Sequence, residues 1–311
     1  MTANSIIDNC KFYANKKWDI VNYDGAGVEI KNCTFDGAIS TASGHSMNIH
    51  HNTFEYKPRE EGDNIFPNTC LNINTHDNIV HDNTFIGGQV VNAGEGCENY
   101  NNIYRNAKPT ITTSGANKYY NCEVAVNQGT QFTTMEDSYF ENCNVSLSKD
   151  EPAITLTNCE FKNSSCNPRG ATVMDRCTFD MSDKSVFDGW RTDGTDVTYR
   201  NCTFKSTYNS KIPLLGKSTK FLATFEDCNF NISRYWLGDI NKNFTFNTCN
   251  FIFNDINQST DTCYLNTHDG TSSWTRDYWY FNSCFFKSTL PVEISGGHVV
   301  NPTIEGSVTA V

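Results

Sequence analysis

Aromatic and acidic residues gather in the second half of the chain, in stretches that interrupt a recurring pattern of short apolar segments. Flat aromatic rings cover the apolar faces of sugars, and carboxylates accept hydrogen bonds from sugar hydroxyls or transfer protons. These residue types therefore indicate a carbohydrate-binding site. The side chains that we expect to contact substrate are Trp190, Arg191, Tyr235, Trp236, His268 and Trp274. A plain structural role, in which the tryptophans only cover the fold, is the alternative.

Four aspartates in the same stretches are candidate catalytic residues. Glycoside hydrolysis needs two carboxyl groups about 5 Å apart for retention, or about 6.5–9.5 Å apart for inversion. In a fold that stacks strands about 4.8 Å apart, residues one or two repeats apart reach these separations. Asp188 and Asp239 are two repeats apart and form the candidate pair, with Asp193 and Asp269 as substitutes. Because Asp beside Gly is ordinary turn chemistry, a purely structural role is again open.

A histidine-containing segment occurs twice. The sequence Asn-Thr-His-Asp at 74–77 returns at 266–269. A His beside an Asp can act as a general base or contribute to a metal site, but an Asx-type turn used twice explains the repetition better. Cysteines outside the recurring pattern show no metal-ligand spacing, and these are Cys70, Cys97, Cys166 and Cys263. We therefore expect neither a metal nor a cofactor.

The recurring unit must position all of these residues. Its marker is a Cys or Asn, with Phe, Tyr or Val two residues later and usually an apolar residue three residues earlier. The markers are Cys10, Cys33, Asn52, Asn83, Asn102, Cys122, Cys143, Cys159, Cys177, Cys202, Cys228, Cys249 and Cys284. They are 16 to 35 residues apart, and the longer steps locate inserted loops. Apolar and polar residues alternate within each unit, which is typical of short strands.

This pattern predicts a parallel β-helix. A leucine-rich repeat needs several Leu per unit, whereas the chain has nine in 311 residues. The segment Met47-Asn-Ile-His-His-Asn-Thr-Phe54 resembles the V-x-I-x-N-N-T-F-x-G coil of right-handed parallel β-helices in the pectate-lyase-like superfamily. We predict an all-β, single-stranded right-handed parallel β-helix of 12 or 13 coils with an Asn/Cys ladder. Residues 1–311 would form one domain, with coils over about 6–298 and a C-terminal cap or extension over 299–311.

The resemblance indicates the fold more strongly than it indicates any particular enzymatic reaction. The superfamily includes lyases, glycoside hydrolases, phage tailspikes and proteins with no known chemistry. The paired Asp motifs, Gly-His-Gly turn and Arg-x-Lys strand of polygalacturonases are absent, and the Gly-Gly-His at 296–298 matches only in part. No Asp cluster like the calcium site of pectate lyases aligns either. No catalytic residue is therefore transferred from the family.

Charge and the N-terminal sequence bear on partners and location. The net charge of −11 disfavours a nucleic-acid partner. Residues 1–7 have neither a basic start nor a long apolar run, so we expect no signal peptide and no membrane insertion. Ten of the markers are Cys in positions that Asn also fills, which favours inward-packed, reduced thiols over a disulfide framework.

These observations lead to one hypothesis and one alternative. We expect a carbohydrate-recognising β-helix of the phage tailspike or depolymerase type, a homotrimer that binds a polysaccharide or cell-surface glycan. If its aspartates are catalytic, it would be a glycoside hydrolase or a lyase acting on the virion or outside the cell. The sequence assigns no compartment. The alternative is a structural or adhesive β-helix module without catalysis.

Overall fold

The computed structural model describes most of the chain. The described residues are 3–13, 20–23, 25–37, 39–42, 44–57, 68–73, 75–127, 133–148, 154–168, 171–186, 195–206, 214–215, 217–218, 221–232, 239–240, 244–253, 263–264, 279–294 and 298–310. They contain strands and turns, with no helix and therefore no helix that could span a membrane. The chain divides into two compact units, Met1–Pro152 and Ala153–Val311, and each is described by itself.

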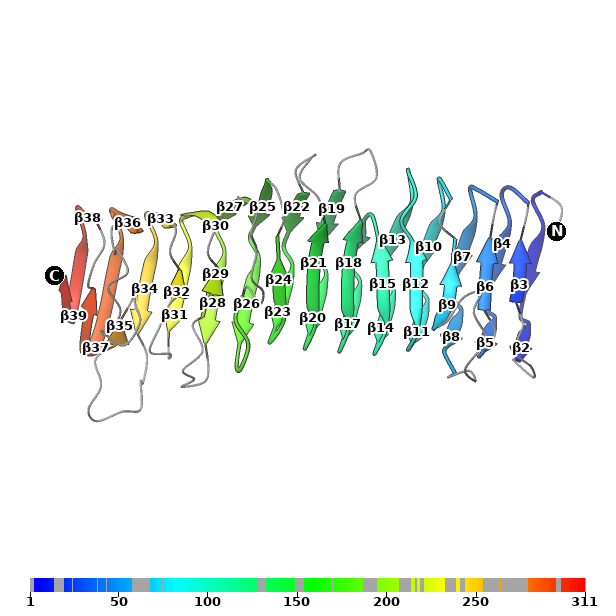
Figure 1. Ribbon diagram of the computed structural model, residues 1–311, viewed down its shortest axis with the longest axis horizontal. Coiled ribbons are helices and arrows are strands. Elements are labelled where there is room, and N and C mark those ends of the chain that lie inside the picture. The colour runs from blue at the N-terminus through cyan, green and yellow to red at the C-terminus, as the bar shows by residue number, and fades with distance from the viewer. Residues whose placement is uncertain are drawn as a thin grey trace. The chain divides into compact units, whose positions relative to one another are not determined.

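The first unit is a stack of coils, each contributing one strand to three parallel sheets, here called A, B and C (Figure 1). Sheet A has the order β1 (Ile6–Asp8), β4 (Glu29–Lys31), β7 (Asn48–His50), β10 (Ile79–His81), β13 (Glu98–Tyr100), β16 (Ser114–Gly115), β19 (Thr133–Glu136). Sheet B has the order β2 (Lys11–Tyr13), β5 (Thr34–Asp36), β8 (Thr53–Glu55), β11 (Thr84–Ile86), β14 (Ile103–Arg105), β17 (Lys118–Tyr120), β20 (Tyr139–Glu141). Sheet C has the order β3 (Ile20–Tyr23), β6 (Ile39–Ala42), β9 (Thr69–Asn72), β12 (Gln89–Asn92), β15 (Lys108–Ile111), β18 (Glu123–Asn127), β21 (Asn144–Ser148).

The second unit also has strands of sheets A and B, whereas only one of its described strands, β24 (Ser165–Asn167), belongs to sheet C. Its sheet A strands are β22 (Ile154–Thr157), β25 (Thr172–Asp175), β27 (Thr195–Arg200), β30 (Phe221–Glu226), β33 (Phe244–Asn247), β36 (Trp279–Asn282) and β38 (His298–Val300). Its sheet B strands are β23 (Glu160–Lys162), β26 (Thr178–Met181), β28 (Thr203–Ser206), β31 (Asn229–Ile232), β34 (Asn250–Phe253) and β37 (Phe285–Ile294), and β35 (Cys263–Tyr264) and β39 (Thr303–Ala310) pair with β37. The remaining strands are β29 (Lys217–Ser218) and β32 (Asp239–Ile240).

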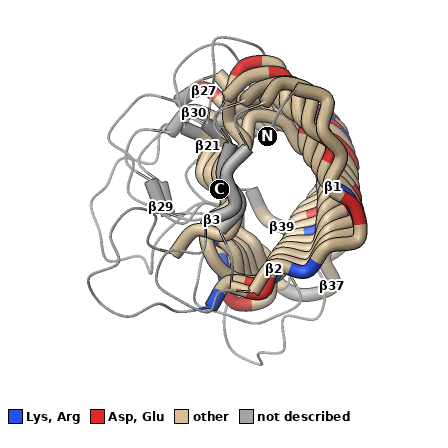
Figure 2. Tube along the Cα trace, turned by 90° about the vertical axis from the view of Figure 1, so that its right-hand side faces the viewer, with Lys and Arg blue, Asp and Glu red and all other residues tan. Residues whose placement is uncertain are grey.

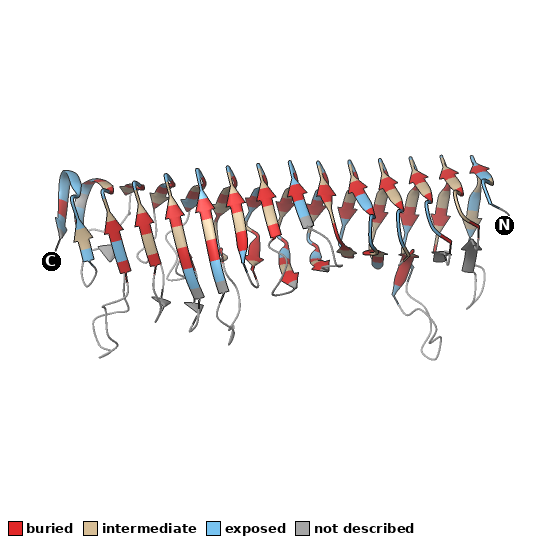
Figure 3. Cartoon of the chain, turned by 90° about the horizontal axis from the view of Figure 1, so that it is seen from above, coloured by how far each residue is buried: buried red, intermediate tan, exposed pale blue. Residues whose placement is uncertain are grey.

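Inward-facing aromatic rings form the core of both units. Side chains alternate between buried and accessible along the strands, as period-two strands require (Figure 3). Rings from consecutive sheet B strands stack face to face, with centroids 4.5 to 5.0 Å apart in the first unit. The second unit continues this arrangement from Phe161 to Phe286. We call these stacks the ring columns. Charged residues lie at the outer corners of the coils, as the view from the β1 end shows (Figure 2).

The corner between sheets A and B carries the predicted Asn/Cys ladder. Asn83 illustrates the bonding, because its Oδ1 accepts the backbone N–H of Asn52 at 2.9 Å and its Nδ2 donates to the carbonyl of Ile49 at 2.8 Å. The residue before each marker has a left-handed backbone, for example Asn32 with φ of 54°, which Asn and Asp tolerate better than most residues. The predicted all-β parallel β-helix with buried, stacked Asn is therefore confirmed.

Two markers were expected at this corner and lie elsewhere. Cys122 and Cys143 precede β18 and β21 of sheet C, so the prediction that they mark the corner between sheets A and B is wrong. Asn117 and Ser138, both buried, fill that corner instead, and each precedes a residue of the ring column by two positions. The error arises because the corner between sheets B and C has the same local chemistry, a left-handed Asn followed by a small buried residue.

Candidate functional site

Most predicted site residues lie outside the described part of the chain. They are Asp188, Trp190, Arg191, Asp193, Tyr235, Trp236, His268, Asp269 and Trp274, and their assignments stay predictions. Only the backbone of Asp239 is described. It belongs to β32 and pairs in parallel with Lys217 of β29. The described Trp279 is 3% exposed and packs against Phe244 and Phe246, so this tryptophan belongs to the core.

The strands that flank the predicted residues are in register. In the second unit, residues 182–194, 233–243 and 254–278 each connect the end of a sheet B strand to the start of the next sheet A strand of that unit. The connections start from the ends of sheet B strands, and these ends are aligned, as the pairing of Ile232 with Phe253 shows. The connections finish at the starts of sheet A strands, which are also aligned, as the pairing of Phe244 with Trp279 shows. The backbone therefore brings the anchor points of these three connections into two parallel rows.

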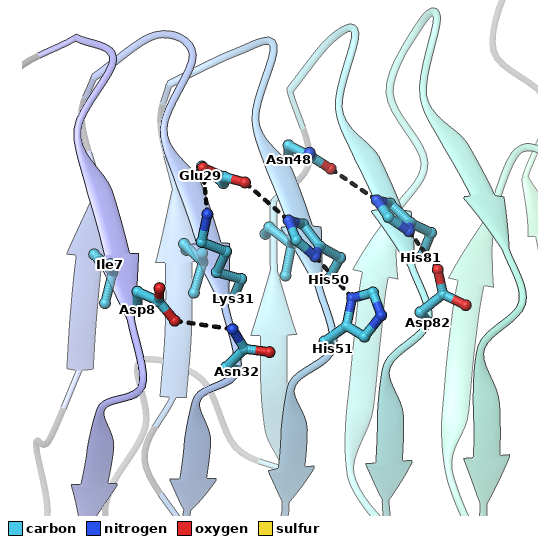
Figure 4. Close-up of polar contacts among 12 residues, drawn as sticks. Ile7, Asp8, Glu29, Lys31, Asn32, Asn48, His50, His51, His81 and Asp82 are labelled. Carbon is cyan, nitrogen blue, oxygen red and sulfur yellow. Dashed lines mark hydrogen bonds and ion pairs between the residues drawn. The ribbon is translucent and has the colours of Figure 1, made fainter.

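The described residues contain a second polar cluster, in the first unit. Its centre is a row on the outer face of sheet A, in which Lys31, His50, His81 and Tyr100 are aligned on β4, β7, β10 and β13. The rings of His50 and His81 stack with centroids 4.8 Å apart, and those of His81 and Tyr100 also stack at 4.8 Å. We call these residues the histidine row, and Figure 4 shows three of them, Lys31, His50 and His81. In-register pairing puts like residues of neighbouring coils in direct contact, which explains the stacking.

Each ring nitrogen of the histidine row has a partner. His50 Nε2 donates to Glu29 Oε1 at 3.0 Å, and its Nδ1 lies 2.8 Å from Nδ1 of His51 (Figure 4). His81 Nδ1 lies 2.6 Å from Asp82 Oδ2, and His81 Nε2 lies 3.1 Å from the side-chain oxygen Oδ1 of Asn48 on β7. Both ring nitrogens therefore face oxygen atoms.

The contacts with His50 and Lys31 change the ionisation of the Glu29 carboxylate. The hydrogen bond from His50, followed by that from Lys31, lowers the pKa of Glu29 below its ordinary value. The Lys31 ammonium lies 3.2 Å from Glu29 Oε2. The physical cause is that both donors favour the charged form of the carboxylate.

A second pair of histidines lies at the corner that leads into sheet A. The rings of His45 and His76 stack at 4.5 Å, and His76 Nδ1 lies 2.8 Å from Asp77 Oδ2. Asp77 has a left-handed φ of 57°, and the next residue, Asn78, accepts the backbone N–H of Met47. The described residues of this His-Asp segment, 75–77, thus contribute to a turn, as turn chemistry predicts.

The histidine row offers no open platform for sugars. Neighbouring rings cover both faces of His81, so its edges are what the solvent reaches. Among the described residues, no group of three or more His, Cys, Asp or Glu side chains is placed to hold a metal ion. Sequence reasoning missed this row, although His50, His81 and Tyr100 each lie two positions before a marker and so share one phase of the repeat.

Comparison with protein-family models, with curated proteins and with solved structures finds no match to this chain.

Proposed function

We propose that this protein is a carbohydrate-recognising β-helix, which binds a polysaccharide or cell-surface glycan through the connections from sheet B to sheet A in its second unit. The observation that carries the proposal is the alignment of the strands flanking these connections. Trp190, Trp236 and Trp274 lie on three such connections, which are anchored to the same two rows of strand ends. The connection 207–220 lies between those of Trp190 and Trp236, so the three rings would be spread along several coils, which suits a long, repetitive ligand.

The pairing of β29 with β32 supports the same location. β29 lies in the connection after β28, and β32 lies in the connection after β31, so connections from consecutive coils pair in parallel. This pairing places the backbone of Asp239, a candidate catalytic carboxylate, beside the neighbouring connection. Residues on connections of neighbouring coils are therefore close enough to contact one ligand.

A glycan array combined with a reducing-end assay tests the proposal. Trp236→Ala should weaken binding at least tenfold, because a ring that covers a sugar face is lost. The matched control is Tyr280→Ala, which removes a partly exposed ring of the same unit that stacks on His298 on sheet A. Equal effects of the two substitutions, or the absence of binding to any glycan by the parent chain, would reject the proposal.

The same samples separate catalysis from binding. If the aspartates are catalytic, Asp188→Asn or Asp239→Asn should abolish product while leaving binding intact, because only proton transfer or nucleophilic attack is lost. Binding without product from the parent chain would identify an adhesive module instead.

A further inference from the structure

The second unit stacks thiols at the corner between sheets A and B. The strands on either side are in register, so Arg200 pairs with Glu226 before the corner and Thr203 pairs with Asn229 after it. This register aligns a Cys of each coil with a Cys of the next, about 4.8 Å away. The aligned residues are Cys159, Cys177, Cys202, Cys228, Cys249 and Cys284, each at most 1% exposed and none in a disulfide. We call them the thiol column.

Each sulfur of the column interacts with its neighbours above and below. The Cys202 thiol forms hydrogen bonds with those of Cys177 and Cys228, and the Cys249 thiol with that of Cys284. Cys228 sulfur also accepts the backbone N–H of Cys202. Donors aimed at sulfur favour the thiolate.

The one-dimensional arrangement restricts the ligand. Tetrahedral Zn²⁺ needs ligands from four directions, whereas each thiol here has sulfur neighbours only along the column. Neighbouring Cys residues about 4.8 Å apart lie within the Cα range of a disulfide, so metal loading must exclude oxygen. An ion that takes two ligands in a straight line needs only the neighbours that a column of thiols supplies.

We propose that the thiol column binds Cu(I), each ion held in line between the thiolates of two neighbouring coils. Soft thiolate ligands select this ion. Each Cu(I) replaces two thiol protons, which pass to the solvent, and neither the metal nor the sulfur changes oxidation state. The bis-thiolate carries one negative charge, and the backbone N–H groups that point at the sulfurs stabilise it.

Metal loading during refolding tests the site, because the folded column is buried. The full chain is unfolded, then refolded without oxygen in the presence of Cu(I) and bathocuproine disulfonate as competitor. Bound copper is counted, and X-ray absorption gives the number and length of the metal–sulfur bonds. We expect two sulfur neighbours per copper and no nitrogen or oxygen neighbour.

Paired substitutions locate the bound copper. Six thiols can hold three Cu(I) ions in separate pairs, and Cys202→Ser with Cys249→Ser leaves one neighbouring pair, so we expect a loss of about two Cu(I) per chain. The control is Cys70→Ser with Cys97→Ser, which removes two buried thiols outside the column and should leave the copper count unchanged. Serine fits this corner, because Ser138 fills it in the first unit, and circular dichroism checks the fold.

Three results would overturn the proposal. They are failure of the parent chain to retain copper against the competitor, equal losses from the column and control variants, and a spectrum with nitrogen or oxygen neighbours in place of sulfur. If the serine variant does not refold, Cys202→Asn with Cys249→Asn replaces it, because Asn fills the same corner at Asn52 and Asn83.

Discussion

Replacing Phe204 by Ala should remove a large part of the stability of the second unit. The Phe204 ring is fully buried and stacks between Phe179 at 5.0 Å and Phe230 at 4.7 Å. Its edges meet Tyr199 and Phe225, at 5.4 and 5.6 Å. Truncating a core Phe costs about 3–5 kcal/mol, and the cost rises with the cavity that remains. Because backbone pairing fixes the coils on both sides, the cavity cannot collapse, and we expect about 4–5 kcal/mol.

Urea denaturation followed by circular dichroism measures this loss. Cys202→Ser, two residues away, is the first control and should change the free energy of unfolding little, since Ser138 fills the equivalent corner. Phe12→Ala is the second control, because this ring is only partly buried and stacks on Phe35 alone among the described residues. A loss at Phe12 or at Cys202 equal to that at Phe204 would show that the inward face is misassigned.

Three further predictions concern the ladder, the histidine row and assembly. Asn83→Ala should cost about 2–6 kcal/mol in urea denaturation, because the Asn52 N–H and the Ile49 carbonyl both lose their partner; a loss below 1 kcal/mol would contradict this reasoning. The lowered pKa of Glu29 adds stability that is present above the ordinary pKa of about 4.3 and is lost as the pH falls through the lowered value. Glu29→Gln should therefore flatten the decline of the urea midpoint below that pH, and an unchanged decline would count against it. Light scattering at micromolar concentration should give the mass of a homotrimer, and a stable monomer would be the opposite result.

The fold could be predicted because its determinants are local and repeated. An aromatic residue two positions after an Asn or Cys, as in Asn52 with Phe54, satisfies the backbone at a corner and fills the core in one short segment. Each coil repeats this solution, so the pattern is visible without knowledge of long-range contacts. The inward orientation of Phe161 and Phe204 is confirmed, since both are fully buried.

The wrong marker assignments lie where two corners of a coil have similar sequences. Cys122 follows a left-handed Asn at the corner between sheets B and C, and Asn117 follows a left-handed Ala at the corner between sheets A and B. Both satisfy the marker pattern, and only the aromatic residue two positions later separates them: Tyr119 follows Asn117, whereas Val124 follows Cys122. A stricter requirement for an aromatic ring would have selected Asn117.

The geometry of in-register strands also bears on where a sugar could bind. Pairing in register places each outward ring directly above the ring of the next coil, so His50, His81 and Tyr100 cover one another's faces. A pyranose needs an open ring face, and a regular outer row of a β-helix removes that face wherever aromatic residues repeat. We therefore expect open aromatic faces on the connections between the in-register strands. Trp190, Trp236 and Trp274 lie there, whereas the one described tryptophan on a sheet A strand, Trp279, is buried in the core.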